Sequence, residues 1–67
     1  MFKTIKESSG SITVVNTNNI TRADLKPGST SWKIYFTSGP VLDTENFDSK
    51  EAAIKWYNDT IGKVDTI

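Results

Sequence analysis

The side chains that carry out most protein catalysis are sparse in this sequence. Its 67 residues include no Cys and no His, which excludes thiolate and imidazole chemistry and the usual zinc and haem ligands. A nucleophile would have to be Ser, Thr, Lys or a carboxylate, yet neither a Gly-x-Ser-x-Gly elbow nor a Ser-x-x-Lys pair occurs. We therefore expect a protein that is not an enzyme and that holds no cofactor.

Three carboxylates, Asp43, Glu45 and Asp48, lie close together and raise the question of a calcium loop. An EF-hand loop needs oxygen ligands at its first, third and fifth positions and Gly at its sixth, whereas Phe47 and Asp48 occupy the fifth and sixth positions here. Acidic residues before a helix also suit its dipole, and Asp48 is placed to cap the helix that follows. The sequence therefore predicts no metal site.

Charge and hydropathy limit the classes of partner. The chain has 8 Lys and Arg against 8 Asp and Glu and a pI of about 6.1, so it projects no strong field toward duplex DNA. The first residues lack the apolar stretch of a signal peptide, and no run approaches the roughly 18 apolar residues of a membrane span. We expect a cytoplasmic protein without a membrane partner.

Length and composition predict one α+β domain over residues 1–67. The first two thirds is rich in β-branched and aromatic residues and is divided by turn-forming clusters, a pattern typical of an antiparallel meander. Five strands fit, over residues 2–6, 12–16, 20–25, 32–37 and 41–45. Residues 32–37 alternate most regularly and should be the centre of the sheet, with Trp32, Ile34 and Phe36 toward the core. Residues 20–25 alternate poorly, because Ile20 would share a face with Arg22 and Asp24, so an edge strand and an irregular loop both fit.

A C-terminal helix should cover one face of this sheet. Asp48 is the expected N-cap, with Glu51 completing a capping box and Gly62 ending the helix. One helical face collects the apolar residues Ala53, Ile54, Tyr57, Ile61 and Val64. Trp56 falls at the flank of that face. The fold class is therefore an antiparallel β-meander of four to five strands with one helix packed on one face.

Our functional hypothesis is a non-catalytic protein-interaction module. So small a domain buries only roughly 60% of its unfolded surface, and without disulfides or a metal a partner subunit is the remaining stabiliser, so a homodimer fits. Ile5, Val15 and Tyr35 could leave apolar surface on the second sheet face, and a partly exposed Trp56 is a further contact candidate. Small domains without motifs are common among phage and mobile-element products and bacterial regulators.

Single-stranded nucleic acid is the alternative partner. An exposed sheet face carrying Tyr35, Lys33 and Arg22 could stack unpaired bases and neutralise phosphates, although the neutral net charge argues against it. A small-ligand or metal-sensing domain is a third and weaker option. The predicted interaction residues are Trp56, Tyr35, Lys33, Val15 and Arg22.

Overall fold

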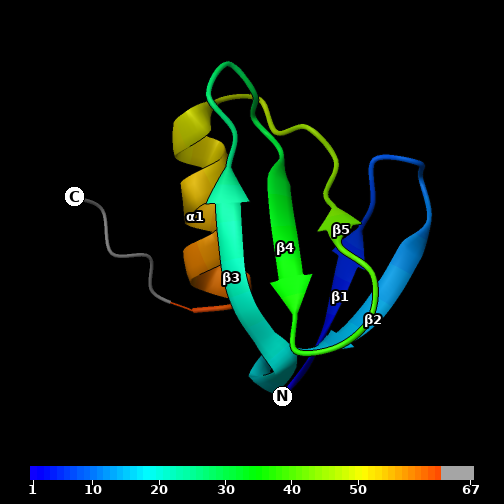
Figure 1. The fold of residues 1–67 in the computed structure, drawn as a ribbon. Coiled ribbons are helices and arrows are strands. Elements are labelled where there is room, and N and C mark those ends of the chain that lie inside the picture. The colour runs from blue at the N-terminus through cyan, green and yellow to red at the C-terminus, as the bar shows by residue number, and fades with distance from the viewer. Residues whose placement is uncertain (63–67) are drawn as a thin grey trace.

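The computed structural model describes residues 1–62, so the expected contribution of Val64 to the helix lies outside the described residues. The elements, in chain order, are β1 (Phe2–Lys6), β2 (Ile12–Asn16), a 3₁₀ turn (Thr17–Asn19), β3 (Ile20–Leu25), β4 (Trp32–Phe36), β5 (Leu42–Asp43) and α1 (Lys50–Thr60) (Figure 1). They confirm the predicted α+β fold with an antiparallel meander and a C-terminal helix.

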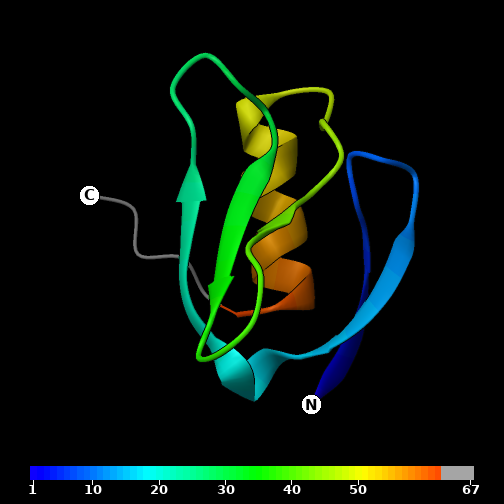
Figure 2. The same cartoon turned by 45° about the vertical axis from the view of Figure 1, so that its right-hand side comes forward.

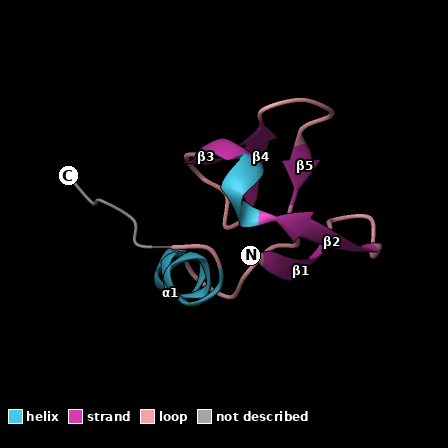
Figure 3. Cartoon of the chain, turned by 90° about the horizontal axis from the view of Figure 1, so that it is seen from below, coloured by secondary structure: helices cyan, strands magenta, loops and turns pink. Residues whose placement is uncertain are grey.

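The strands form two antiparallel sheets that meet along one seam. β1 and β2 form a hairpin, and β4 lies between β3 and β5 in the second sheet. An antiparallel bridge between Glu7 and Thr44 joins the sheets, and the Glu45 N–H donates to the Lys6 carbonyl at 3.0 Å. The spatial order is therefore β2-β1-β5-β4-β3. The hairpin and α1 both lie on one side of the three-stranded sheet (Figures 2 and 3).

The core lies between the helix, the three-stranded sheet and the inner side of the hairpin. Its buried apolar residues are Ile5, Val15, Trp32, Ile34, Leu42 and Ala53. The Trp32 indole N–H donates to the Ala53 carbonyl at 2.9 Å, and the Trp32 ring lies 4.6 Å from the Tyr57 ring, centroid to centroid. Trp32 thus helps to hold α1 on the sheet both by packing and by a buried hydrogen bond.

Thr44 explains why β5 is shorter than predicted. Its N–H donates to the Trp32 carbonyl at 3.0 Å, as in a regular ladder. The Trp32 N–H donates to the Thr44 hydroxyl at 2.8 Å instead of to a backbone carbonyl. Because this fully buried hydroxyl replaces the carbonyl, the backbone is released from β4 and turns toward β1.

The segment Ile20–Leu25 is a strand, which answers the question that its poor alternation left open. The register with β4 shifts between Ile20 and Arg22, since Ile20 pairs with Phe36 and Arg22 with Tyr35. This bulge inserts one residue and reverses the alternation. Ile20 therefore packs against the core although it shares parity with Arg22, and its expected place on the Arg22 face is wrong.

The helix begins one residue later than predicted. Ser49 has extended backbone angles, and its hydroxyl accepts the Ala52 N–H at 3.0 Å, so Ser49 is the N-cap. The expected cap at Asp48 and its capping box with Glu51 are therefore wrong. Glu51 still lies in the first turn, where its charge suits the helix dipole.

The two candidate caps can be separated by matched substitutions. Ser49→Ala removes the hydroxyl that accepts the Ala52 N–H and should lower the free energy of unfolding by about 1 kcal/mol. Asp48→Ala should change it by less than about 0.5 kcal/mol, because Asp48 contributes at most a screened charge near the helix start. Urea denaturation followed by circular dichroism measures both, and a larger loss for Asp48→Ala would contradict the assignment.

The Thr44 hydroxyl can be tested in the same way. Thr44→Val keeps the shape of the side chain but leaves the buried Trp32 N–H without its acceptor, so we expect a loss of about 1–3 kcal/mol. Thr44→Ser keeps the hydroxyl, loses one methyl group and should cost about 1 kcal/mol. The prediction fails if thermal unfolding ranks the Val variant as the more stable of the two.

Candidate functional site

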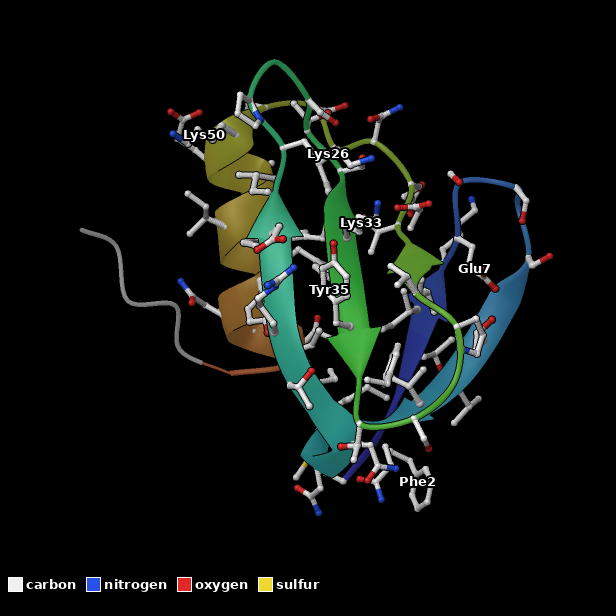
Figure 4. All side chains as sticks on the ribbon, in the orientation of Figure 1. Phe2, Glu7, Lys26, Lys33, Tyr35 and Lys50 are labelled. Atoms are coloured by element: carbon white, nitrogen blue, oxygen red, sulfur yellow. The ribbon has the colours of Figure 1, made fainter. Side chains whose placement is uncertain are left out.

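Three of the predicted interaction residues come together on the outer face of β3 and β4. Tyr35 and Lys33 point away from α1 (Figure 4). Arg22 reaches across from β3, and its guanidinium carbon lies 4.2 Å from the centroid of the Tyr35 ring. A hydrogen bond with Tyr35 and the charge of Asp24 raise the pKa of Arg22 above its ordinary value. One face of the Tyr35 ring is thus covered by a cation within the molecule.

Carboxylates balance the positive charges on this face. Asp24 forms an ion pair with Arg22 at 3.3 Å between Nη2 and Oδ2. Lys33 lies opposite Asp24 in the register of β3 and opposite Asp43 in that of β5. A nucleic-acid phosphate would meet two acidic side chains, Asp24 and Asp43, beside the two basic ones, so the face forms no groove of positive potential.

The other two predicted residues lie at or near the core. Val15 is only 7% exposed, and Ile5 is fully buried, so their expected place on an open sheet face is wrong. Trp56 is half-buried and stacks on Phe47 with ring centroids 5.1 Å apart. Its ring therefore supports the start of α1, and it does not lie with Tyr35.

The open apolar surface is instead the other face of the first hairpin. Phe2 is 71% exposed, Ile12 68% and Val14 63%. In the hairpin register Val14 lies opposite Thr4 and Ile12 opposite Lys6, so Val14 neighbours Ile12 along its own strand and Phe2 diagonally across the pair. We call Phe2, Ile12 and Val14 the outer hairpin face.

Sequence reasoning missed this face because it placed the wrong side of β2 on the surface. The alternation of the two strands offers two faces, one with Phe2, Ile12 and Val14 and one with Ile5 and Val15. Apolar content alone would bury the first, yet the structure buries the second. The available signal was that Ile12–Asn16 carries apolar residues on both faces, so that either choice leaves some of them in water.

A groove of about 370 Å³ lies between the inner side of β2 and the connection from β4 to β5. Its apolar walls are formed by Val15, Phe36, Pro40, Val41 and Leu42. Glu7 and Thr13 line it as well, and the Glu7 carboxylate accepts a hydrogen bond from the Thr13 hydroxyl. Glu7 is the one charged side chain among the described residues that line this groove.

The residues that the structure describes assemble no metal centre. Within residues 1–62 no three carboxylates are grouped to hold a metal ion, and no helix is long and apolar enough to cross a membrane. The pKa values of Arg22, Lys55 and Tyr57 are all raised, Lys55 by its hydrogen bond to Asp59 and Tyr57 by burial. Each shift moves the pKa of the group further above 7, which does not favour proton transfer at pH 7.

Neighbouring residues of β2 provide a direct test of which face is buried. Val15→Ala removes methyl groups from the core, whereas Val14→Ala removes them from solvent, and both substitutions lower β-propensity alike. We expect Val15→Ala to lower the free energy of unfolding by about 1.5 kcal/mol more than Val14→Ala does. Urea denaturation at low protein concentration measures the difference, and equal losses would show that both faces are covered.

Comparison with known proteins gives no relative from which function could be transferred. No protein-family model matches the chain, and no curated protein and no solved structure is significantly similar to it. Function has to be argued from the surface that the hairpin presents.

Proposed function

We propose that this chain is a non-catalytic protein-interaction module that binds another polypeptide, a second copy or a different protein, through the β1–β2 hairpin. The observation that carries the proposal is the outer hairpin face, in which Phe2, Ile12 and Val14 are between 63% and 71% exposed. Removing apolar surface of this kind from water by covering it with another surface lowers the free energy.

This face differs from the scattered apolar residues of an ordinary surface. Its three members are neighbours across one strand pair, and Met1, which is 70% exposed, precedes them directly. Together they expose on the order of a few hundred Å², the size at which patches on monomeric proteins are often functional. Thr4 and Lys6 interrupt and border the patch, an arrangement of apolar centre and polar rim that is common at interfaces.

The alternative, binding of single-stranded nucleic acid, is less well supported. It would use Tyr35, Lys33 and Arg22, but Arg22 already stacks on Tyr35, and Asp24 and Asp43 accompany the cations. A base would have to displace Arg22 or stack on it, and phosphates would be repelled by the carboxylates. The outer hairpin face is apolar, so its attraction for a partner does not depend on charges that neighbouring carboxylates neutralise.

Site-specific photo-crosslinking in the cells that encode the protein tests the proposal. A photoreactive phenylalanine analogue replaces Ile12 in one variant and Lys55 in a control variant, because the Lys55 side chain is 77% exposed on α1, away from the hairpin. We expect a discrete protein adduct from position 12 that position 55 does not give, since only position 12 should lie under a partner.

The adduct also identifies the class of partner. A mass of twice the chain indicates a second copy, and a larger or smaller protease-sensitive increment indicates a different protein. A product that nuclease removes would replace the proposal with the nucleic-acid alternative. Identical products at both positions, or none at position 12, would refute the hairpin as the binding element.

A further inference from the structure

The two edge strands, β2 and β3, are protected to different degrees from pairing with another strand. β3 forms one outer edge and carries Arg22, Asp24 and a bulge, three features that discourage pairing with another strand. β2 forms the other edge, and Ile12–Asn16 contains no charged residue and no Pro. Among the described residues no strand pairs with that edge. β2 is therefore open to strand addition where β3 is not.

The hydrogen bonds at both ends of the hairpin show which backbone groups face outward. The Glu7 N–H donates to the Ser11 carbonyl at 2.8 Å, and the Thr17 N–H to the Met1 carbonyl at 2.8 Å. Hydrogen-bonded pairs alternate along an antiparallel ladder, so Thr13 and Val15 direct their backbone groups toward β1. The N–H and carbonyl groups of Ile12 and Val14 consequently point away from the hairpin.

The groove lies on the inner side of this same edge. An added strand would continue the pleat of β2. Every second side chain of the added strand would therefore lie on the same face as Thr13 and Val15. That face lies toward the apolar wall formed by Phe36, Pro40 and Val41. The backbone edge and the groove can therefore engage one extended chain together, with main-chain hydrogen bonds for affinity and the groove for selectivity.

One end of the groove carries a negative charge, which favours a cationic side chain of a partner. The carboxylate of Glu7 lies beside the start of β2, since Glu7 bonds to Ser11 through its backbone and to Thr13 through its side chain. No basic side chain is found among the described residues that line the groove. A cationic residue of the partner would complement this carboxylate in a partly dry setting, where an ion pair is stronger than in water.

Area argues against a second copy held by the outer hairpin face alone. A stable interface buries roughly 800 Å² on each partner, more than the few hundred Å² that the outer hairpin face exposes. A strand that also used the edge and the groove would engage three features of the hairpin at once.

We propose that β2 accepts an extended segment of a partner protein as an additional antiparallel strand. Apolar side chains at alternate positions of that segment occupy the groove, and a Lys or Arg at its C-terminal end pairs with Glu7. We infer the antiparallel direction because antiparallel pairs are slightly more stable per residue and more common than parallel ones, and it places the C-terminal end of the segment beside the start of β2. This inference rests on the proposed function and specifies its partner.

A labelled probe peptide tests the inference on the full chain. It has about six residues, capped at both ends, alternates Val and Thr and ends in Lys. Fluorescence anisotropy gives its Kd, and we expect replacement of the Lys by Glu to raise the Kd at least about tenfold. In the Glu7→Gln variant the two peptides should bind within about threefold of each other, because the charge that distinguishes them is gone.

Backbone methylation of the peptide tests strand pairing without changing the protein. Two further peptides carry N-methyl groups on alternate residues, one on the odd positions and one on the even positions. Only one set of amides can face β2, so one peptide should lose at least about tenfold in affinity and the other little. Equal binding of both would overturn strand addition, whatever the role of Glu7.

Two matched substitutions in the protein, both at Val14, test the same strand pairing. Val14→Pro removes an outward N–H without breaking a hairpin hydrogen bond, whereas Val14→Thr also changes the side chain but keeps that N–H. We expect at least about tenfold weaker peptide binding for Val14→Pro alone, with the amide spectrum and melting temperature confirming that both variants are folded. If the Pro variant does not fold, the methylated peptides still decide.

Failure of this inference can be told from failure of the proposed function. If the probe peptide does not bind but position 12 still crosslinks to a protein, strand addition is refuted and the interaction module stands. If position 12 crosslinks only to a second copy, and Val14→Pro leaves the probe peptide bound as tightly as before, the partner chemistry inferred here is wrong. Loss of both signals would remove both conclusions.

Discussion

The Trp32–Thr44 pair is the contact on which the rest of the structure depends. Through its backbone Trp32 bonds to the buried Thr44 hydroxyl, and through its indole it holds the Ala53 carbonyl of α1. The same Thr44 forms the bridge to Glu7 that attaches the hairpin. One position of β4 thereby connects the three-stranded sheet, the helix and the hairpin. Because these hydrogen bonds are buried, the loss of either one would weaken the connection between the parts as well as the local contact.

This junction also determines which side of the hairpin is buried. Because the chain leaves β4 at Thr44 and meets β1 there, the hairpin packs with Ile5 and Val15 toward Trp32 and Leu42. Phe2, Ile12 and Val14 are left in water although they form the more apolar face. The hydrophobic effect within one chain would favour the reverse. The tertiary connection thus accounts for the exposed face, which the proposed partner would cover.

Local patterns in the sequence predicted the strands and the helix, and failed where the answer depended on tertiary contacts. The hairpin strands, the turn at Gly28 and the central position of β4 follow from alternation and turn chemistry. The bulge in β3 and the cap at Ser49 each depend on one residue of shift and the early end of β5 on two, which a period of two or a capping preference cannot resolve. The expected exposure of Val15 was wrong for the same reason, since nothing in Ile12–Asn16 alone decides which face turns inward.

The unequal edges carry the functional argument beyond the apolar patch. If β2 were an ordinary solvent-exposed edge, a charge, a Pro or a bulge would be expected there, as the arginine, the aspartate and the bulge of β3 illustrate. β2 has none of these, and an apolar groove with a single carboxylate lies along its inner side. Three features coincide on one hairpin: the open edge of β2, the groove and the outer hairpin face. One partner strand explains all three more simply than three separate causes do. In the proposed complex the hairpin is the part of the molecule that binds, and the helix and second sheet support it.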